Sequence, residues 1–356
     1  FEYTCHWGKS VEKHCPKSFV FPNSPAPKPK IRMGYLSRDF YDQSMIFFIT
    51  GLLSEYDKQV FEVFCYADIE RQDQITQQLK TLVDVWHDIH SLTVKEVLQL
   101  IYTDHIDILV DPGVGNSTSL KCIQPFAYQP APIQITFSLI STGLTTIDYR
   151  ITDAYLTPQE ENTTEKLLYL PLCRCYTPPS GLPPVNELPS RQKGYITFGS
   201  FNNALKFNRD VLTLWGQILK AIPYSQLILK HVAFQSAQTR DYFKALFEEC
   251  DVNVSQITLV NYTPTRKEHF QLYQSIDIAL DPFPYNGHTT TCEALWMGVP
   301  VITLQGKTAF GRFAGDILTS LGLEELIANS PPEYVNIALH LAHNLEKLET
   351  LRLSLR

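Results

Sequence analysis

The sequence lacks a long apolar run, and it shows no excess of basic charge. No stretch reaches the roughly 18 apolar residues that a membrane-spanning helix requires, and no signal peptide opens the chain. The formal net charge is -7 over 356 residues, which excludes attraction of nucleic acid or an anionic membrane by the bulk charge. We therefore predict a cytoplasmic protein without a membrane or nucleic-acid partner, in which any phosphate-binding site is local.

Cysteine is also sparse, with 8 residues scattered along the chain. This spacing excludes a disulfide-stapled module and offers no CxxC pair typical of zinc, so we expect reduced, mostly buried thiols and no metal site. Cys173 and Cys175 form the closest pair, and metal binding or redox chemistry there is the alternative.

The sequence does contain two regions in which short apolar strands alternate with helices. These regions, residues 31–175 and 194–356, predict an α/β protein with two doubly wound Rossmann-like domains facing each other across a cleft. Residues 176–193, which hold five prolines, are predicted to be a Pro-rich linker. Residues 1–30, with four prolines between positions 22 and 29, are predicted to be an extended lead-in without helix.

The periodicity assigns individual elements. Predicted strands cover residues 31–36, 60–66, 106–110, 133–137, 149–152, 167–169, 195–198, 226–230, 257–260, 276–280 and 299–304. Predicted helices cover residues 44–53, 73–81, 94–103, 209–222, 239–250, 269–275, 290–297 and 312–321.

The richest stretch, Asp281 to Pro300, runs from a predicted strand through a turn into a predicted helix. Asn286 and the glycine after it permit a tight turn, which places His288, Thr289 and Thr290 at the helix N-terminus. Unpaired backbone N–H groups and the helix dipole attract phosphate there. The stretch therefore predicts a phosphate site.

Each of these residues also has a purely structural interpretation. Thr289 or Thr290 is alternatively an N-cap, and His288 an ordinary loop histidine. Glu293 either accepts hydrogen bonds from ribose or sugar hydroxyls or is an acid favoured by the helix dipole.

Several segments in one order carry a family resemblance. They are Ile31-Arg-Met-Gly-Tyr35, Asp107-Ile-Leu-Val-Asp111, Ala131-Pro-Ile-Gln134, Ile147-Asp-Tyr-Arg-Ile-Thr-Asp153, Phe198-Gly-Ser-Phe-Asn-Asn203 with Lys206, Asn286-Gly-His-Thr-Thr290 and Leu321-Gly-Leu-Glu-Glu-Leu-Ile327. Over roughly residues 31–356 the chain resembles the O-linked N-acetylglucosamine transferase and SPINDLY family. The resemblance implies a GT-B glycosyltransferase that moves a sugar from a nucleotide-diphosphate sugar to serine or threonine of proteins.

The resemblance also implies roles for four residues that bind the donor. Lys206 matches a lysine that contacts the diphosphate, whereas alone it would be a solvated lysine before a helix. Asn203 stands where vertebrate members have a glutamine near the diphosphate. His269 matches a histidine that packs against the uracil ring, and Arg266 stands where the family often has lysine.

The predicted turn completes the donor site that the resemblance implies. His288, Thr289 and Thr290 match the phosphate-binding turn, and Glu293 matches the acid that holds the ribose. Lys206 and His288 are the candidate catalytic residues. The donor is expected to be UDP-N-acetylglucosamine, with a GDP-sugar as the alternative, and no cofactor or metal is expected.

The N-terminal domain departs from the family pattern in three loops. Gln43 stands where a histidine is usual, and an amide can hydrogen-bond but cannot act as a general base. The loop 111–118 lacks a second histidine, common in bacterial relatives. The loop 137–143 lacks the glycines of a Gly-Tyr-Pro-Gly segment, which restricts close backbone approach to a ligand.

These features leave two main functional hypotheses. The leading one is protein O-glycosylation, with a protein acceptor and with partners recruited by tetratricopeptide repeats outside this chain. The alternative is a non-catalytic nucleotide-binding relative, favoured by Gln43 and by the loop 137–143, which is shorter than in relatives. A dinucleotide-dependent oxidoreductase is a third idea, suggested by Gly113-Val-Gly115, but Thr118 stands where the fingerprint requires its third glycine.

Overall fold

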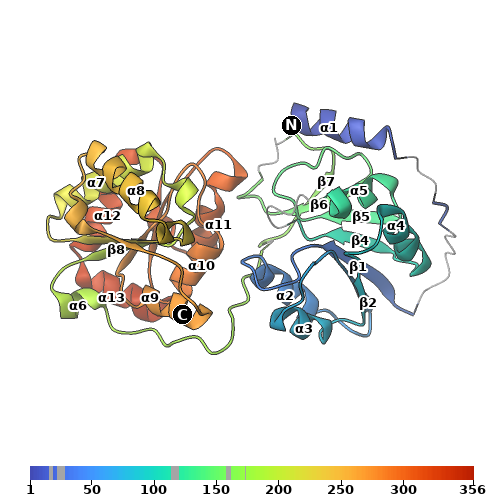
Figure 1. The fold of residues 1–356 in the computed structure, drawn as a ribbon, viewed down its shortest axis with the longest axis horizontal. Coiled ribbons are helices and arrows are strands. Elements are labelled where there is room, and N and C mark those ends of the chain that lie inside the picture. The colour runs from blue at the N-terminus through green and yellow to red at the C-terminus, as the bar shows by residue number, and fades with distance from the viewer. Residues whose placement is uncertain (16–18, 22–28, 114–119, 158–161, 173) are drawn as a thin grey trace. The chain divides into compact units, whose positions relative to one another are not determined.

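The computed structural model describes residues 1–15, 19–21, 29–113, 120–157, 162–172 and 174–356. It divides the chain into two compact units, Phe1–Thr177 and Pro178–Arg356, called unit 1 and unit 2 below. Each unit contains one parallel sheet with helices on both faces (Figure 1). The predicted α/β class with two doubly wound domains is therefore confirmed.

Unit 1 is built on a seven-stranded sheet with the order β3-β2-β1-β4-β5-β6-β7. Its strands are β1 (Ile31–Ser37), β2 (Phe61–Ala67), β3 (Val85–Asp88), β4 (Ile108–Asp111), β5 (Ile133–Thr136), β6 (Tyr149–Thr152) and β7 (Lys166–Tyr169). Its helices are α1 (Glu2–Glu12), α2 (Ile46–Ser54), α3 (Gln74–Lys80), α4 (Val94–Thr103) and α5 (Leu120–Tyr128). In Figure 1, α2 and α3 lie on one face of this sheet, and α4 and α5 on the other.

The prediction of a lead-in without helix is wrong for the first residues, because Glu2–Glu12 form α1. The prolines behind that prediction begin farther along the chain, and most of residues 22–29 lie outside the described residues. Packing stabilises α1. The Glu12 carboxylate accepts a hydrogen bond from the backbone N–H of Thr145 at 2.6 Å, and Gly8 lies so close to Gly143 that neither position has room for a Cβ atom.

Unit 2 is built on a six-stranded sheet with the order β10-β9-β8-β11-β12-β13. Its strands are β8 (Thr197–Ser200), β9 (Gln226–Lys230), β10 (Ile257–Val260), β11 (Ile278–Leu280), β12 (Val301–Leu304) and β13 (Ile327–Ala328). Its α-helices are α6 (Pro189–Lys193), α7 (Arg209–Ala221), α8 (Ala237–Glu249), α9 (Arg266–Tyr273), α10 (Thr289–Trp296), α11 (Phe313–Ser320), α12 (Pro331–Ala342) and α13 (Leu345–Ser354). Counted within the unit, the strand order is 3-2-1-4-5-6, the order of a dinucleotide-binding Rossmann fold.

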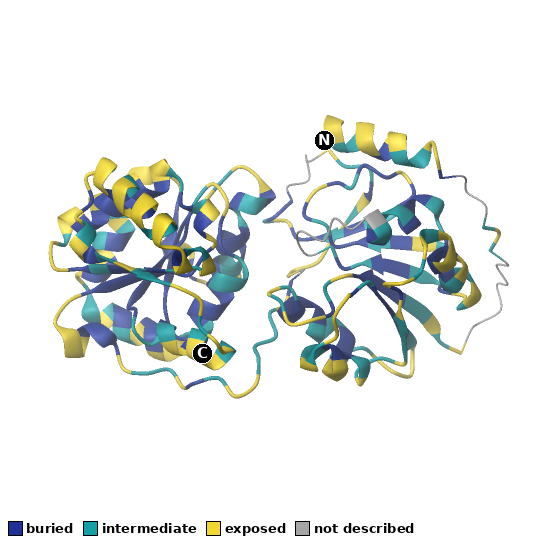
Figure 2. Ribbon diagram, viewed as in Figure 1, coloured by how far each residue is buried: buried dark blue, intermediate teal, exposed yellow. Residues whose placement is uncertain are grey.

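The strands of unit 2 are mostly buried between the surrounding helices (Figure 2), and the helices bury large aromatic side chains such as Trp215 and Tyr334 in the core. Trp215 of α7 donates a hydrogen bond from Nε1 to the hydroxyl of Tyr334 in α12 at 3.2 Å. That hydroxyl donates in turn to the backbone carbonyl of Asp281 at 3.0 Å. The core therefore fixes the backbone at the end of β11, where the predicted turn begins.

The segment predicted to be a linker contains structure of its own. Residues 178–193 belong to unit 2 and include α6. Arg352 of α13 donates from Nε to the carbonyl of Asn186 at 2.7 Å, and Asp277 accepts from the N–H of Ser190 at 2.8 Å. These contacts attach the proline-rich segment to the sheet of unit 2.

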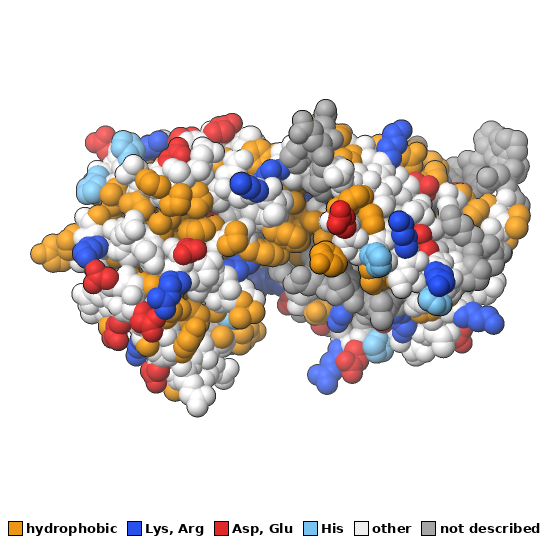
Figure 3. Space-filling model, turned by 90° about the horizontal axis from the view of Figure 1, so that it is seen from above, with side chains coloured by type: hydrophobic (Ala, Val, Ile, Leu, Met, Phe, Trp, Pro, Cys, Tyr) orange, Lys and Arg blue, Asp and Glu red, His pale blue; other side chains and the backbone are white. Residues whose placement is uncertain are grey.

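Within the described residues, no helix is long and apolar enough to cross a membrane. On the face shown in Figure 3, acidic and basic side chains are interspersed.

Candidate functional site

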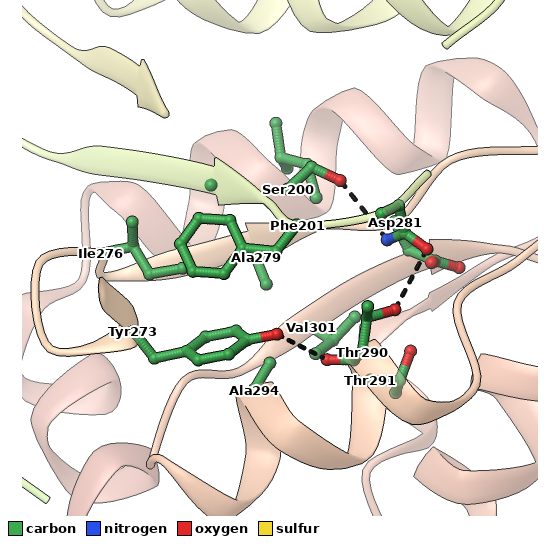
Figure 4. Close-up of a pocket in the computed structure, with 13 residues that line it drawn as sticks. Ser200, Phe201, Tyr273, Ile276, Ala279, Asp281, Thr290, Thr291, Ala294 and Val301 are labelled. Atoms are coloured by element: carbon green, nitrogen blue, oxygen red, sulfur yellow. Dashed lines mark hydrogen bonds between the residues drawn. The ribbon is translucent and has the colours of Figure 1, made fainter. Parts of the chain in front are cut away.

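The predicted donor site lies at the carboxyl end of the unit 2 sheet, where β8 and β11 are neighbours. The chain leaves these two strands in opposite directions across the sheet, so this is the topological switch point at which doubly wound folds bind ligands. A cavity of about 10 Å³, with room for about one water molecule, lies here, and Figure 4 shows residues that line it. The hydroxyl of Thr291, which lines this cavity, is buried and has no hydrogen-bond partner among the described atoms.

Lys206 enters this site from η1 (Ala204–Lys206), the short 3-10 helix after β8. Its Nζ donates to the carbonyl of Asn286 at 2.8 Å and to Oδ1 of Asn202 at 3.3 Å, and lies 4.3 Å from the ring centroid of Tyr285. Burial lowers the pKa of Lys206 to about 8, although the charge of Asp281 opposes this shift. The Lys206 ammonium already interacts with the charge of Asp281, and it can bind a second anionic group.

Asp281, directly after β11, is the buried acid that organises the turn. Its carboxylate accepts hydrogen bonds from the N–H of Gly287 at 2.6 Å and from the hydroxyl of Thr303 at 2.7 Å. Burial raises the pKa of Asp281 to about 7, against the effect of these bonds and of Lys206. A Cβ atom at Gly287 would lie 2.6 Å from Oγ1 of Thr290 and 2.8 Å from Asp281, so the turn requires glycine.

The turn delivers the chain into α10, whose first residue is Thr289. The N-cap is His288, whose side chain makes no cap hydrogen bond, so neither threonine is the N-cap. The His288 ring instead stacks on Phe313 with 4.5 Å between centroids. Thr290 Oγ1 donates to Oδ1 of Asn202 at 3.1 Å. The start of α10 and the loop after β8 are thereby tied together, with the helix dipole directed at the site.

A second cluster lies one turn farther along α10, around Glu293. His269 of α9 places Nε2 at 2.9 Å from Oε2 of Glu293, and Tyr273 donates its hydroxyl to the same oxygen at 3.2 Å. On the other side of the ring, Nδ1 of His269 lies 2.7 Å from Nζ of Lys230. Burial lowers the pKa of Arg266, and the charge of Glu293 opposes this shift.

The structure thus brings Lys206 and Thr290 together through Asn202, and joins His269 to Glu293. It places the side chain of Asn203 differently: its Oδ1 caps η1 by accepting the N–H of Leu205 at 3.0 Å. The nucleotide-binding roles of all these residues stay predictions.

Asn202, Asp281 and Lys230 are the residues that sequence reasoning missed. Asp281 directly follows the predicted strand 276–280, and Asn202 lies in the loop after the predicted strand 195–198, which is a usable signal. Lys230 ends a predicted strand but belongs to no motif.

The side chain of Gln43 in unit 1 makes hydrogen bonds within its own loop. Its Oε1 accepts the N–H of Met45, the residue before α2, at 2.9 Å, and its Nε2 donates to the carbonyl of Asp39 at 3.3 Å. In the loop after β4, the Asp111 carboxylate accepts the hydroxyl of Thr136 at 2.7 Å. Residues 114–118 of that loop lie outside the described residues, as does Cys173.

The loop 137–143 is organised by an acid and a helix. Glu165 accepts hydrogen bonds from the hydroxyl of Ser141 at 2.9 Å and the N–H of Thr142 at 2.7 Å. Burial opposes ionisation of Glu165, but hydrogen bonds from Thr142 and Thr163 outweigh it and lower the pKa. Gly143 adopts φ +77° where α1 passes over it at Gly8. The close backbone approach in this loop is therefore made to the chain's own first helix.

Comparison with known proteins identifies the family to which the chain belongs. The description of glycosyl transferase family 41 matches residues 9–175 and 187–356. The chain belongs to glycosyl transferase family 41. This confirms the resemblance that the ordered segments carried.

Relatives in family 41 include plant and bacterial proteins. The chain is 36% identical to the probable UDP-N-acetylglucosamine--peptide N-acetylglucosaminyltransferase SPINDLY of Solanum lycopersicum, over 99% of this chain and 39% of that protein. It is 30% identical to the corresponding SEC protein of Arabidopsis thaliana, over 92% of this chain and 34% of that protein. The chain therefore spans less than half of the length of these plant relatives.

A solved structure of a protein from Thermobaculum terrenum has the same fold as this chain. That protein is a mutant O-GlcNAc transferase, and it matches with a TM-score of 0.90 and 33% identity, covering 99% of this chain and 68% of that one. The predicted GT-B class is confirmed by this match.

Proposed function

We propose that this chain is the catalytic region of a protein O-glycosyltransferase that moves a sugar from a UDP-sugar to serine or threonine hydroxyls of a protein. The names of its relatives support N-acetylglucosamine as the sugar and a peptide as the acceptor. The single observation that carries the proposal is Lys206, a half-buried ammonium at the switch point of unit 2 beside the start of α10.

The transfer breaks the bond between the anomeric carbon and the phosphate oxygen and joins the acceptor oxygen to that carbon, with release of the hydroxyl proton. Negative charge grows on the departing UDP. Lys206 and the first N–H groups of α10 are suited to hold that charge, because they are preorganised and partly shielded from water. The hydroxyl of Thr290 lies at the same place and can add a neutral donor if it exchanges its bond to Asn202 for one to phosphate. Stabilising the leaving group is thus the contribution that unit 2 is built to make.

A second candidate is a nucleotide-binding protein that does not transfer sugar. The observation in its favour is Gln43, whose amide is held by two hydrogen bonds in its own loop and cannot take a proton. Removing a general base typically costs about 10²- to 10⁴-fold in rate, so slow transfer is compatible with this residue.

Two measurements on the full chain separate these candidates. Calorimetry compares UDP with GDP as the control nucleotide, and a coupled assay follows UDP release from UDP-N-acetylglucosamine with an acceptor peptide. UDP binding with peptide-dependent release supports the transferase. UDP binding without release supports the non-catalytic candidate, and absence of binding by either nucleotide overturns the donor site.

A further inference from the structure

Lys230 lies at the carboxyl end of β9, the strand next to β8, and its side chain meets His269 rather than solvent alone. The contact joins Nζ to Nδ1 at 2.7 Å, with both side chains partly buried. An ammonium carries three donors and no acceptor, so Nδ1 accepts this hydrogen bond and carries no proton. The hydrogen of the neutral imidazole then sits on Nε2.

The other side of the ring agrees with this tautomer. Nε2 lies 2.9 Å from Oε2 of Glu293, and a carboxylate is an acceptor, so Nε2–H donates to it. Lys230, His269 and Glu293 therefore form one directed chain of hydrogen bonds across β9, α9 and α10. Tyr273 donates to the same Oε2 at 3.2 Å and fixes the carboxylate from a second direction.

The Glu293 carboxylate interacts with two cationic side chains in this arrangement. Burial lowers the pKa of Lys230, and the charge of Glu293 opposes that shift, as it does for Arg266. Two cations thus face one carboxylate, and the ring between Lys230 and Glu293 stays neutral. The ring of Phe201 lies beside the imidazole, with 6.0 Å between centroids, and limits its rotation.

We propose that Lys230 is a positioning residue for the nucleotide: by donating to Nδ1 it holds His269 in the Nε2–H tautomer and so fixes the ring plane and the Glu293 carboxylate together. The inference rests on the proposed function, in which His269 packs on the base and Glu293 holds the ribose. Without the ammonium, the ring is free to turn over, and both groups lose their fixed orientation.

The test uses two variants that separate the hydrogen bond from the bulk of the side chain. Lys230→Met keeps the length and removes the donor, whereas Lys230→Gln keeps an N–H donor without charge. Lys220→Met is the matched control, because Lys220 is an exposed lysine of the same unit paired with Asp251. Histidine ¹⁵N NMR of the full chain near neutral pH, with His269→Gln to assign the signal, reports the tautomer directly.

We expect the wild-type ring to show an unprotonated Nδ1 and a protonated Nε2. Lys230→Gln and Lys220→Met should keep this signature, and Lys230→Met should lose it. In calorimetry, Lys230→Met should bind UDP about tenfold more weakly, the equivalent of about one hydrogen bond, while Lys230→Gln recovers most of the affinity. The thermal unfolding temperature of Lys230→Met should stay close to that of the wild type, whereas a general packing defect would lower it.

Two results overturn the inference: a wild-type ring protonated at Nδ1, or a Lys230→Met variant with the wild-type tautomer and UDP affinity. The NMR readout needs no nucleotide. If the wild type binds no UDP, the proposed function fails, and the tautomer still decides whether Lys230 sets the ring.

Discussion

Replacing Lys206 by methionine tests the donor site at its half-buried ammonium. Two donors of the ammonium already meet Asn286 and Asn202, which leaves one N–H for a phosphate oxygen without breaking either bond. Methionine keeps most of the apolar contact with Tyr285 and removes all three donors. The change therefore deletes the interaction with phosphate while it leaves the packing nearly intact.

The expected loss follows from the strength of a hydrogen bond to a charged group. Such a bond contributes about 1.5–3 kcal/mol, which corresponds to UDP binding weakened by about 10- to 150-fold. Calorimetric titration of Lys206→Met with UDP measures this loss directly. The control is Lys220→Met, which should retain wild-type affinity, and thermal unfolding of both variants should stay close to that of the wild type.

The same lysine predicts a pH dependence with a definite sign. The pKa of free Lys206 is lowered to about 8, and a bound diphosphate favours the ammonium, so binding takes up a proton above that pH. Wild-type affinity should fall as pH rises through about 8, by about tenfold at one unit above the pKa. Because the pKa of Asp281 is about 7, measurements above pH 7.5 isolate the lysine.

Lys206→Met should show no such fall, since it has no group to titrate in this range. Equal affinity of variant and wild type, or a wild-type profile that is flat between about pH 7.5 and 9.5, would refute the assignment of Lys206 to the diphosphate.

Two further substitutions address the turn and the N-terminal loop. Gly287→Ala places a Cβ atom against Thr290 and Asp281. It should therefore lower the free energy of unfolding by about 1–3 kcal/mol and abolish UDP binding. A variant with the wild-type free energy of unfolding and the wild-type UDP affinity would contradict the tight turn. Gln43→His removes the hydrogen bond to Met45, so it should lower the free energy of unfolding, measured with denaturant, by about 0.5–1.5 kcal/mol. An increase in transfer rate of about 10²-fold would show that the lack of a base at this position limits the reaction. An unchanged rate would mean that Gln43 has a structural role only.

The sequence predicts the parts of the fold in which local pattern and burial agree. The strands at 149–152, 226–230 and 257–260 have the predicted boundaries, because short runs rich in β-branched and apolar residues fit a buried parallel sheet. The strand Val85–Asp88 was not predicted, since its four residues mix aromatic and polar side chains at an edge of the sheet. The helix α1 was missed because its position depends on the contact between Gly8 and Gly143, which are far apart in the sequence.

The candidate site shows the same division. Lys206 and the turn before α10 were predictable, because strand ends, glycine turns and helix starts recur wherever phosphate is bound. The choice between neighbouring asparagines was not, since the backbone after β8 decides that Asn202 faces Lys206 while Asn203 caps η1. Lys230 was invisible because only the adjacency of β8 and β9 and the direction of α9 bring it to His269.

The departures in unit 1 have a physical account that differs from simple loss. Gln43 bonds to the backbone of Asp39 and Met45, and the loop 137–143 is held by Glu165 and by α1, so these two altered loops have partners within the same unit. A decayed site would instead leave polar groups without partners, which costs stability for each buried group. The charge that acts on Lys206 comes from Asp281 of the same unit, whereas Gln43 belongs to unit 1. Nucleotide binding and sugar transfer can therefore be lost separately in this chain, and only an assay that follows the transferred sugar distinguishes an enzyme from a binding protein.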